Sequence, residues 1–417
     1  MYDRTHRGLR CVFFCPDLPE GFWMALDYDK LFSPRARALD TSGIRRVFEL
    51  GATLDDPINL SIGQPDFPVP GAIKRAAIEA IERDDNGYTM TQGIAPLRAR
   101  VCEHLKEDLG WPGDLGERGA GTQAMVTSGT SGALLLTMLA LLGEGDEIIV
   151  PDPYFVAYPS MPVVAGGRAV LCDTYPDFRM TADRIEPLIT GRTKAVLIDS
   201  PSNPAGVVMS EEECRSVLEL CRSRGVLLVS DEIYDEFTFS DHMVDVGGGR
   251  RAAPSPARFE GAHEDVLVIR GFGKTYGCTG WRMGYAAGPA PVIAELTKMQ
   301  QYSYVCSPTP LQHGCLASFG VDMRETVARY ARRRDLALEI LREATEAPTP
   351  GGAFYLFAEA RGMTGQELFE RAVERNVLVI PGNVFSSRDT HFRVSVACPE
   401  DRLEHGLRAI AGILGGG

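Results

Sequence analysis

The stretch Gly271-Phe-Gly-Lys-Thr-Tyr-Gly-Cys-Thr-Gly-Trp-Arg282 directly follows the apolar run Val266-Leu-Val-Ile-Arg270, and it is the most informative part of the chain. The run is typical of a buried strand. The turn after it presents Lys274, and Arg282 follows eight residues later. Where water is scarce, the pKa of a lysine falls and its amine becomes nucleophilic, while an arginine can hold a phosphate. The stretch therefore indicates a site that holds a phosphorylated carbonyl compound through an amine.

Two simpler interpretations of this stretch compete with that one. Gly273-Lys274-Thr275 resembles the end of a phosphate-binding P-loop, but that motif requires glycine at position 268, where the chain has Val268. The P-loop is therefore rejected. The second alternative is a surface turn with a solvated lysine, which is the commonest environment of lysines. The rest of the chain decides against it.

Length and composition exclude several classes of protein. With 417 residues the chain has room for two domains, and 44% apolar with 24% charged residues is ordinary for a globular protein. The net charge of −13 argues against nucleic acid or an anionic membrane as a partner. No apolar run reaches the length of a membrane span. The ten cysteines show no zinc-binding spacing, so we expect reduced thiols, no metal and a cytoplasmic location.

The chain is expected to have four parts. Residues 1–23 carry scattered arginines and a short apolar run, and we expect a disordered extension rather than a signal peptide. Residues 24–66 have no sheet of their own and are expected to pack on a small domain. Residues 67–310 are expected to form the large, cofactor-binding domain, and residues 311–417 a smaller α+β domain.

Short apolar runs alternate with helical patterns through the middle of the chain, and several are continuously hydrophobic, as in strands buried on both faces. Seven runs predict a mostly parallel seven-stranded sheet in a three-layer α/β/α domain. They are Ala124–Thr127, Glu147–Val150, Arg168–Cys172, Lys194–Ile198, Val226–Val229, Val266–Ile269 and Gly284–Ala287. In such a sheet, ligands bind at the carboxyl ends of the strands.

Helix and loop signals complete the outline. Ser210 with Glu213 and Thr364 with Glu367 have the spacing of capping boxes. The charged stretch 324–346 has helical periodicity and is expected to link the two domains. Residues 240–264, rich in Gly, Pro and Arg, are expected to form a surface loop. In the last hundred residues, 377–380 and 392–396 are expected to be strands.

Distinctive residues follow the predicted strands. Ser128-Gly-Thr-Ser-Gly132 opens a helix and could hold a phosphate with its backbone N–H groups, although a plain N-cap is the alternative. Phe155 could stack on a planar ring or belong to the core. Asn203 stands in a turn and could donate to a phenolate oxygen, but ordinary turn chemistry would also explain it.

Three further residues need partners if they are buried. Asp231 ends a predicted strand and would pair well with a protonated ring nitrogen, with a helix N-cap as the alternative. Tyr234 could reach the same ring as Asn203. Arg393 lies within an apolar strand, where a substrate carboxylate would fit its guanidinium and an internal salt bridge is the rival.

Taken together, these features resemble the class I/II aminotransferases, which are pyridoxal-phosphate enzymes of fold type I. The resemblance runs from about Asp27 to Leu414. Its landmarks are Asn59-Leu-Ser-Ile-Gly-Gln-Pro-Asp66, Gly87-Tyr-Thr-Met-Thr-Gln-Gly-Ile94, Ser200-Pro-Ser-Asn-Pro204, Asp231-Glu-Ile-Tyr234, Lys274-Thr-Tyr, Gly280-Trp-Arg282 and Phe392-Arg393.

The resemblance implies a set of residues that contact pyridoxal 5'-phosphate. Lys274 would form the Schiff base with the cofactor and then move the proton. Asp231 would pair with the ring nitrogen, and Tyr234 would join Asn203 at the phenolate oxygen. Phe155 would stack on the ring. The phosphate would be contacted by Gly129, Thr130, Ser131 and Arg282. Tyr88 would reach the phosphate from the neighbouring subunit of a homodimer with shared active sites.

The resemblance also implies a substrate site and a reaction. Arg393 would bind the substrate's α-carboxylate, assisted by the backbone near Gly63 and by Asn203. The expected activity moves an amino group from an L-amino acid to a 2-oxo acid by ping-pong kinetics. Aspartate, aromatic, methionine and alanine donors remain open, and Phe354 and Tyr355 could line the substrate pocket or belong to the core.

Two other activities were weighed against amino transfer. A C–S β-lyase on the same scaffold would share the lysine, aspartate and arginine. A non-catalytic ligand sensor would carry a DNA-binding domain before the fold, for which the segment ahead of it is too short.

The chain also departs from the family pattern at Gly271, where many members have a phosphate-binding serine. We expect weaker cofactor binding there, or compensation by Ser131.

Overall fold

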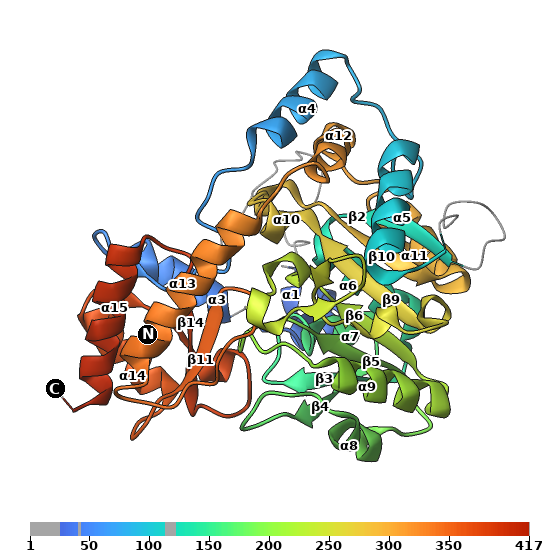
Figure 1. Cartoon of the computed structure of the whole chain (residues 1–417). Helices are drawn as coiled ribbons and strands as arrows, with labels where there is room; N and C mark the ends of the chain where they lie inside the picture. The colour runs from blue at the N-terminus through green and yellow to red at the C-terminus, as the bar shows by residue number, and fades with distance from the viewer. Residues whose placement is uncertain (1–25, 41–42, 113–121, 417) are drawn as a thin grey trace, which may run out of the picture.

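The computed structural model describes residues 26–40, 43–112 and 122–416, and the expected extension of residues 1–23 lies outside this part. A seven-stranded sheet forms the centre of the large domain (Figure 1). All its strands run parallel except β10, which is antiparallel to both of its neighbours. In sheet order the strands are β2 (Thr122–Thr127), β10 (Gly284–Pro289), β9 (Val266–Gly271), β6 (Leu227–Asp231), β5 (Thr193–Asp199), β3 (Glu147–Asp152) and β4 (Arg168–Asp173). The seven predicted strands are thereby confirmed.

Helices cover both faces of this sheet, because the strands are apolar on both sides. In β9, Val266 and Val268 belong to one buried cluster, whereas Leu267 and Ile269 belong to another. The first cluster contains side chains of α5 (Ala95–Leu109), α8 (Ala182–Ile185), α9 (Glu211–Arg224) and α12 (Thr309–Ser318). The second contains side chains of α6 (Gly129–Leu141), α7 (Ser160–Ala165) and α11 (Ala290–Ser303). The fold is the predicted three-layer α/β/α arrangement.

The smaller domain is built on a three-stranded antiparallel sheet beside the large one (Figure 1). Its sheet contains β11 (Tyr355–Glu359), β14 (His391–Ser395) and β13 (Ile380–Pro381). Its helices are α13 (Arg324–Leu341), α14 (Gly365–Glu374) and α15 (Glu400–Leu414). The predicted strand 377–380 is interrupted, since β12 (Val377–Leu378) pairs with a different partner from β13.

The N-terminal segment connects to both domains. β1 (Ile58–Asn59) pairs in parallel with β12, and Leu60 belongs to the buried cluster of the small domain. Earlier in the segment, α1 (Tyr28–Leu31) and α2 (Pro34–Arg37) precede α3 (Gly43–Gly51). Arg35 on α2 donates to Val164 on α7 of the large domain over 3.2 Å.

The expected boundary between the domains lies inside a helix. A boundary between residues 310 and 311 would cut α12, which packs against α4 (Gly71–Glu82) and α5. We therefore place the boundary after α12, so that α13 opens the small domain. Figure 1 shows α4 and α12 side by side at the edge of the molecule.

The segment 240–264 is not simply a surface loop. It contains the short strands β7 (Val244–Asp245) and β8 (Arg251–Ala252), and Ser255, Ala257 and Ala262 are buried. Ala257 accepts a hydrogen bond of 2.7 Å from the indole of Trp111. The glycines and arginines of this segment suggested exposure, but its small residues pack under the sheet.

The expected capping boxes are both present. Ser210 Oγ accepts from the backbone of Glu213 at the start of α9, and the Glu213 side chain accepts from Ser210 N in return. Thr364 and Glu367 do the same at the start of α14. Each box satisfies backbone N–H groups that the first helical turn leaves free.

Candidate active site

A cavity of about 330 Å³ opens at the carboxyl ends of the sheet strands, beside the small domain. It is lined by eleven of the twelve predicted site residues, which are Gly63, Gly129, Thr130, Ser131, Phe155, Asn203, Asp231, Tyr234, Lys274, Arg282 and Arg393. The twelfth, Tyr88, lies in the loop after α4 and is 88% exposed. Residues from β5, β6, α6, β14 and the turn that follows β9 therefore meet at one site, although they are far apart in the sequence.

Lys274 stands in α10 (Phe272–Thr275), the helical turn that directly follows β9. Its ammonium donates to the carbonyl oxygen of Gly63 and lies 5.7 Å from the centre of the Phe354 ring. Burial, followed by repulsion from Arg393 and Arg282, lowers the pKa of Lys274 to about 7. A large fraction of the lysine is therefore a neutral amine, the nucleophilic form, near neutral pH.

Two carboxylates end neighbouring strands of the sheet. Asp231 ends β6 and accepts a hydrogen bond of 2.9 Å from the hydroxyl of the buried Tyr158. Asp199 ends β5, directly beside Asp231 in the sheet register, and accepts from the backbone N–H of Asn203 over 3.0 Å. Burial raises the pKa of Asp231 to about 6 and that of Asp199 to about 7. No described side chain forms an ion pair with either carboxylate, so a cationic ligand would be favoured beside them.

Arg393 is buried on β14 without an anionic partner among the described residues. Its guanidinium donates to the Asn203 side-chain oxygen and to the Ser61 carbonyl, both over 2.9 Å, while its Nε has no partner. The ring of Tyr355 lies under it, 4.3 Å from the guanidinium carbon. Because a buried charge without a counter-ion is costly, the position suits an anionic substrate group.

The Tyr234 hydroxyl lies between this arginine site and Asp231. It is within 3.0 Å of the Tyr355 hydroxyl, and the two rings meet edge to face. Burial raises the pKa of Tyr234 well above its usual range, so the phenol stays protonated. A protonated phenol can donate a hydrogen bond to an oxygen of a bound ring.

The start of α6 and Arg282 form a small cradle for an anion. Gly129 has a φ of 67°, a conformation that glycine adopts without strain. A Cβ atom on Gly129 would lie 2.9 Å from an Arg282 nitrogen, so the guanidinium rests directly on the glycine. Free N–H groups at the helix start and a neighbouring guanidinium are the usual donors to a phosphate.

Pyridoxal phosphate fits this arrangement of donors and charges. The cradle at Gly129 suits its phosphate, and the pair Asp199 and Asp231 suits its protonated ring nitrogen. The partly neutral Lys274 suits its aldehyde. The guanidinium of Arg393, which contacts only neutral acceptors in the described chain, is left to pair with a second, anionic molecule. When bound, the cofactor supplies an electron sink for the electrons released from a substrate carbon.

Several residues of the site were missed from the sequence. Tyr158 is one, and no sequence signal separates it from any other core tyrosine. Ile44 and Phe48 on α3 are others. They line the cavity although α3 lies far along the sequence from Asp231 and Lys274, so the sequence gives no sign that they meet there. Of the two residues whose place was left open, Tyr355 lines the cavity, whereas Phe354 is buried beside it.

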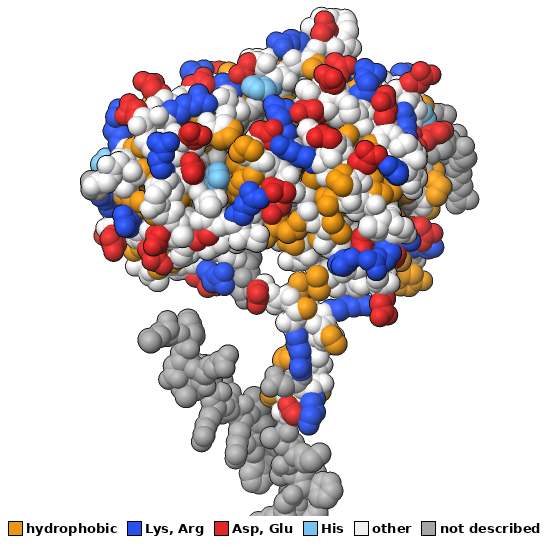
Figure 2. All heavy atoms as spheres, turned by 90° about the horizontal axis from the view of Figure 1, so that it is seen from below, with side chains coloured by type: hydrophobic (Ala, Val, Ile, Leu, Met, Phe, Trp, Pro, Cys, Tyr) orange, Lys and Arg blue, Asp and Glu red, His pale blue; other side chains and the backbone are white. Residues whose placement is uncertain are grey.

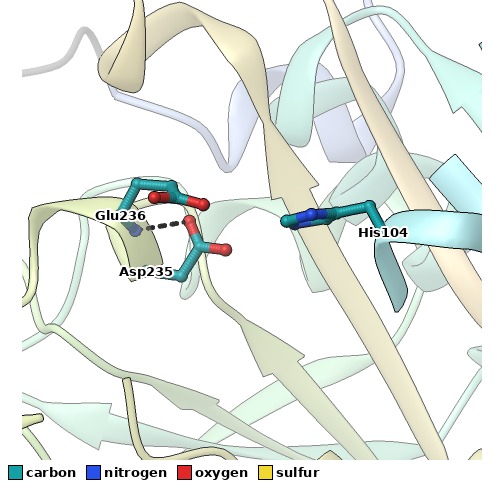
Figure 3. A group of neighbouring side chains, drawn as sticks. All are labelled: His104, Asp235 and Glu236. Carbon is teal, nitrogen blue, oxygen red and sulfur yellow. Dashed lines mark hydrogen bonds between the residues drawn. The ribbon is translucent and has the colours of Figure 1, made fainter. Parts of the chain in front are cut away.

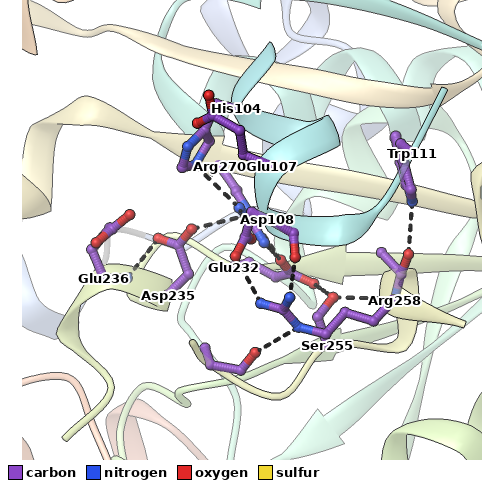
Figure 4. A network of polar contacts seen from close by, with 12 residues as sticks. His104, Glu107, Asp108, Trp111, Glu232, Asp235, Glu236, Ser255, Arg258 and Arg270 are labelled. Carbon is purple, nitrogen blue, oxygen red and sulfur yellow. Dashed lines mark hydrogen bonds and ion pairs between the residues drawn. The ribbon is translucent and has the colours of Figure 1, made fainter. Parts of the chain in front are cut away.

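Directly behind the site, on the opposite face of the sheet, lies a buried ion-pair network (Figure 4). Arg270 on β9 is at its centre, 2.7 Å from Glu232, 2.8 Å from Asp108 and 3.1 Å from Asp235. Arg258 adds a second cation 2.9 Å from Asp108. Although burial acts to raise the pKa of Asp108, the two arginines hold it well below its usual range.

One corner of this network has the composition of a metal site. Ligand atoms of His104, Asp235 and Glu236 lie within 4.8 Å of one another (Figure 3). However, Arg270 Nη1 lies 3.5 Å from His104 Nε2, and Arg270 Nε lies 3.1 Å from the Asp235 carboxylate. The guanidinium therefore already supplies the positive charge that these groups require.

Comparison with known proteins places this geometry in a family. The model of the aminotransferase class I and II family matches residues 55–410. A putative aminotransferase, YugH, of Bacillus subtilis is 34% identical over 90% of this chain and 96% of its own. An aromatic-amino-acid aminotransferase of Thermococcus litoralis is 31% identical over 92% of this chain and 98% of its own. This chain belongs to the class I and II aminotransferases.

Solved structures agree with this assignment. The aspartate aminotransferase of Thermotoga maritima superimposes with a TM-score of 0.84 at 30% identity, over 92% of this chain and all of that one. The Thermus thermophilus aspartate aminotransferase with maleate gives 0.81 at 32% identity, over 92% of this chain and 99% of that one. The fold is therefore that of an aspartate aminotransferase, and the chain is an aminotransferase whose family implies pyridoxal phosphate as cofactor.

Proposed function

We propose that this aminotransferase moves an amino group from an L-amino acid to a 2-oxo acid, with Lys274 as the residue that binds the cofactor and transfers the proton. The observation that carries this proposal is the buried lysine with a pKa of about 7, between the carboxylate of Asp231 and the unpaired guanidinium of Arg393. Pyridoxal phosphate would supply the electron sink.

The residues of the chain would divide the work as follows. Arg393 holds the substrate's α-carboxylate, which fixes the α-carbon near Lys274. The Lys274 amine would take up the α-proton as a general base, and its ammonium would give that proton back as a general acid. When the cofactor is bound, Tyr234 and the NH₂ group of Asn203 would donate to its ring oxygen. Asp231 would pair with the positive charge of its ring nitrogen.

The cavity favours an apolar or aromatic donor. The cations lining it within the described chain are Lys274, Arg282 and Arg393, and each already has a role in this scheme. The apolar part of the lining includes Ile44 and Phe48 of α3. These apolar side chains would contact the substrate's side chain, and they offer no charge to a distal carboxylate.

A homodimer would complete the site and bury exposed apolar surface. Tyr88 projects into solvent from the loop after α4, and in a pair of chains it would reach the neighbouring phosphate site. Other large apolar side chains are exposed on α1 and its flanks, on α4 and the loop after it, and on α11. They are Leu26, Tyr28, Leu31, Phe32, Ile78, Ile81, Met90 and Tyr302. On the face shown in Figure 2, acidic and basic side chains are interspersed, which suits small-molecule substrates better than a nucleic acid.

The state of the cysteines is the basis for proposing where the enzyme is located. The eight cysteines in the described part of the chain are all unpaired, and most are buried. Unpaired thiols are typical of a reducing compartment, which supports the cytoplasm. Among the described helices, none combines the length and the apolar character that a membrane crossing needs.

The C–S β-lyase is the rival function, because it would use the same lysine, aspartate and arginine. The two reactions differ in their need for an amino acceptor. Amino transfer requires a 2-oxo acid for every turnover, whereas a β-lyase releases ammonia and a thiol without one.

An absorption spectrum of the purified protein tests the proposal. We expect a visible band with pyridoxal phosphate that Lys274→Ala abolishes and Lys298→Ala, an exposed control on α11, retains. Single amino acids should convert the band, phenylalanine and leucine faster than aspartate, and a 2-oxo acid should restore it. Product formation from cysteine conjugates without an acceptor would instead establish the lyase. A spectrum that pyridoxal phosphate does not change would overturn the cofactor.

A further inference from the structure

Asp199 and Asp231 are the last residues of β5 and β6, two adjacent parallel strands, and they are partners in the sheet register. Because side chains alternate between the two faces along a strand, partners in register point to the same face. Both residues line the cavity. The family pattern assigns Asp231 to the ring nitrogen of the cofactor and gives Asp199 no role. The site therefore holds two acids where the pattern accounts for one.

The surroundings of Asp199 offer its carboxylate little compensation. Besides the cavity, Asp199 lines a second, small pocket whose other residues are mostly apolar and include Pro151, Phe178 and Met209. Burial, together with repulsion from Asp231, raises the pKa of Asp199 to about 7. No ion pair joins Asp199 to a cation of the described ranges, so its negative charge is held at a cost.

The titratable groups that face the two acids leave this charge open. The Tyr158 hydroxyl donates to Asp231 over 2.9 Å, and burial raises the pKa of this tyrosine well above its usual range, so it stays neutral. Lys274 of α10 attracts Asp231, but its ammonium donates to a backbone carbonyl. On the other side of β5, Asp152 at the end of β3 interacts with Arg388 of the small domain. A cationic group of a ligand would therefore meet two acids that no described cation neutralises.

Resting on the function proposed above, we propose that Asp199 is a second acid for the cofactor's ring nitrogen, and that Asp199 and Asp231 together keep this nitrogen protonated. The positive charge of the ring nitrogen favours the ionised form of both carboxylates, and two negative charges hold a proton on the ring more firmly than one. The ring therefore keeps its proton, and with it its capacity to accept electrons, to a higher pH than Asp231 alone would allow.

Asp199 also has a structural contact, which has to be separated from its charge. Its Oδ2 accepts from the backbone N–H of Asn203 over 3.0 Å, and the Asn203 side chain in turn accepts from Arg393 over 2.9 Å. Asp199→Asn keeps an oxygen that can accept this bond and nearly the same shape, and it removes the charge. Asp199→Ala removes both. The two variants therefore distinguish a role of the charge from support of the turn that holds Asn203.

The affinities of the apo-protein for two cofactors at pH 8, where Asp199 is ionised, test the role of the charge without any turnover. One is pyridoxal phosphate, and the other is its deaza analogue, in which a carbon atom replaces the ring nitrogen, so that only the first can carry the positive charge. We expect Asp199→Asn to lower the preference for pyridoxal phosphate over the analogue about tenfold, and Asp231→Asn to lower it at least as much. Asp173→Asn, at the exposed end of β4, should leave it unchanged.

The proton on the ring nitrogen can also be followed directly. Nuclear magnetic resonance of the protein loaded with ¹⁵N-labelled cofactor reports the fraction of protonated ring nitrogen at each pH. We expect the ring nitrogen of Asp199→Asn to lose its proton about one pH unit below that of the wild type. A residue that only supports the turn would not change this titration.

Three results would overturn the role of Asp199. These are a preference for pyridoxal phosphate within twofold of the wild type in Asp199→Asn, an unchanged titration of the ring nitrogen, and an equal loss of both compounds in Asp199→Asn and Asp199→Ala. A wild-type protein that binds neither compound would instead refute the proposed function. Urea unfolding of the apo-proteins identifies any variant that fails to fold. Should Asp199→Asn fail, Asp199→Ser, which also keeps an accepting oxygen, replaces it.

Discussion

Arg270 and Arg393 are the two largest fully buried side chains in the described chain, yet their surroundings differ completely. Arg270 contacts three carboxylates, whereas Arg393 contacts only neutral oxygens and aromatic rings. The first has all its charge compensated within the protein, and the second lacks a counter-ion. We infer that Arg270 stabilises the fold, and that the charge on Arg393 is kept available for a ligand at a cost in stability.

The largest effect is expected when the charge of Arg393 is removed. Arg393→Met should lower kcat/KM for an L-amino acid about a thousandfold, mostly through KM, because a charge-assisted pair with the carboxylate is lost. The apo-protein should be at least as stable as the wild type, since an unpaired buried charge is removed.

A substrate without a carboxylate provides the control for Arg393. Phenethylamine lacks that group, and its slow conversion in single-turnover absorbance experiments should be the same in Arg393→Met and wild type. An equal loss for phenylalanine and phenethylamine would mean that Arg393 only maintains the structure of the cavity.

Arg270→Met removes the charge of the compensated arginine. It leaves Asp108, Glu232 and Asp235 buried without their common partner, and the free energy of unfolding should fall by about 3–5 kcal/mol. Urea unfolding of the apo-protein measures this. Arg408→Met removes an exposed arginine that pairs with Glu404, and it should leave the urea midpoint unchanged. Comparable midpoints for the two variants would show that the buried network contributes no stability.

Adjacent carboxylates sharpen the comparison further, because Asp231 faces the cavity and Glu232 faces Arg270. Burial raises the folded pKa of Asp231 from 3.8 to about 6, so its ionisation opposes folding above that pH, and the effect disappears below pH 4. Asp231→Asn should therefore stabilise the apo-protein at pH 8 by about 2 kcal/mol while cofactor binding weakens. Glu232→Gln should destabilise it. Urea unfolding at pH 8 and pH 4 measures both, and destabilisation by Asp231→Asn at pH 8 would contradict this account.

The smallest effect concerns pH. The pKa of Lys274 in the folded protein is about 7, against 10.5 for an ordinary lysine, and only the neutral amine attacks an aldehyde. The rate of cofactor capture by the apo-protein should rise about tenfold from pH 6 to pH 8 and level off above it. Stopped-flow absorbance measures this rate. Nα-acetyl-lysine with the same aldehyde provides the reference, and a protein rate that keeps rising in parallel with it to pH 10 would show that Lys274 is not perturbed.

Much of the fold could be predicted from the sequence because its strands are continuous apolar runs with charged or small residues directly after them. Parallel strands bring those residues to one edge, so Asn203, Asp231 and Lys274 could be placed together without any structure. The prediction of a surface loop at 240–264 was only partly right. Residues 241–250 are exposed or half-buried, whereas Ser255, Ala257 and Ala262 are buried, because Gly, Pro and Arg indicate irregular backbone but do not show whether it is exposed.

Arg270 and Arg393 show where sequence reasoning ends. Each is an arginine in an otherwise apolar strand, and for such a residue a ligand and an internal ion pair are equally consistent with the sequence. The partners of Arg270 include Asp108, 162 residues away on α5, so only the folded chain brings them together. The positions of Tyr158 and Phe48 depend on packing in the same way.

The alternation of Asp231, the last residue of β6, and Glu232, the residue after it, has a consequence for how the chain folds. Successive residues of a strand point to opposite faces, so a shift of β6 by one residue would turn Glu232 into the cavity and Asp231 toward Arg270. Glu232 would then lie in the cavity, and the network would lose the contact of 2.7 Å between Arg270 and Glu232. Such a mispaired sheet would be both inactive and unstable. Asp231 in the cavity and Glu232 in the buried ion-pair network thus also help to select the native strand alignment during folding.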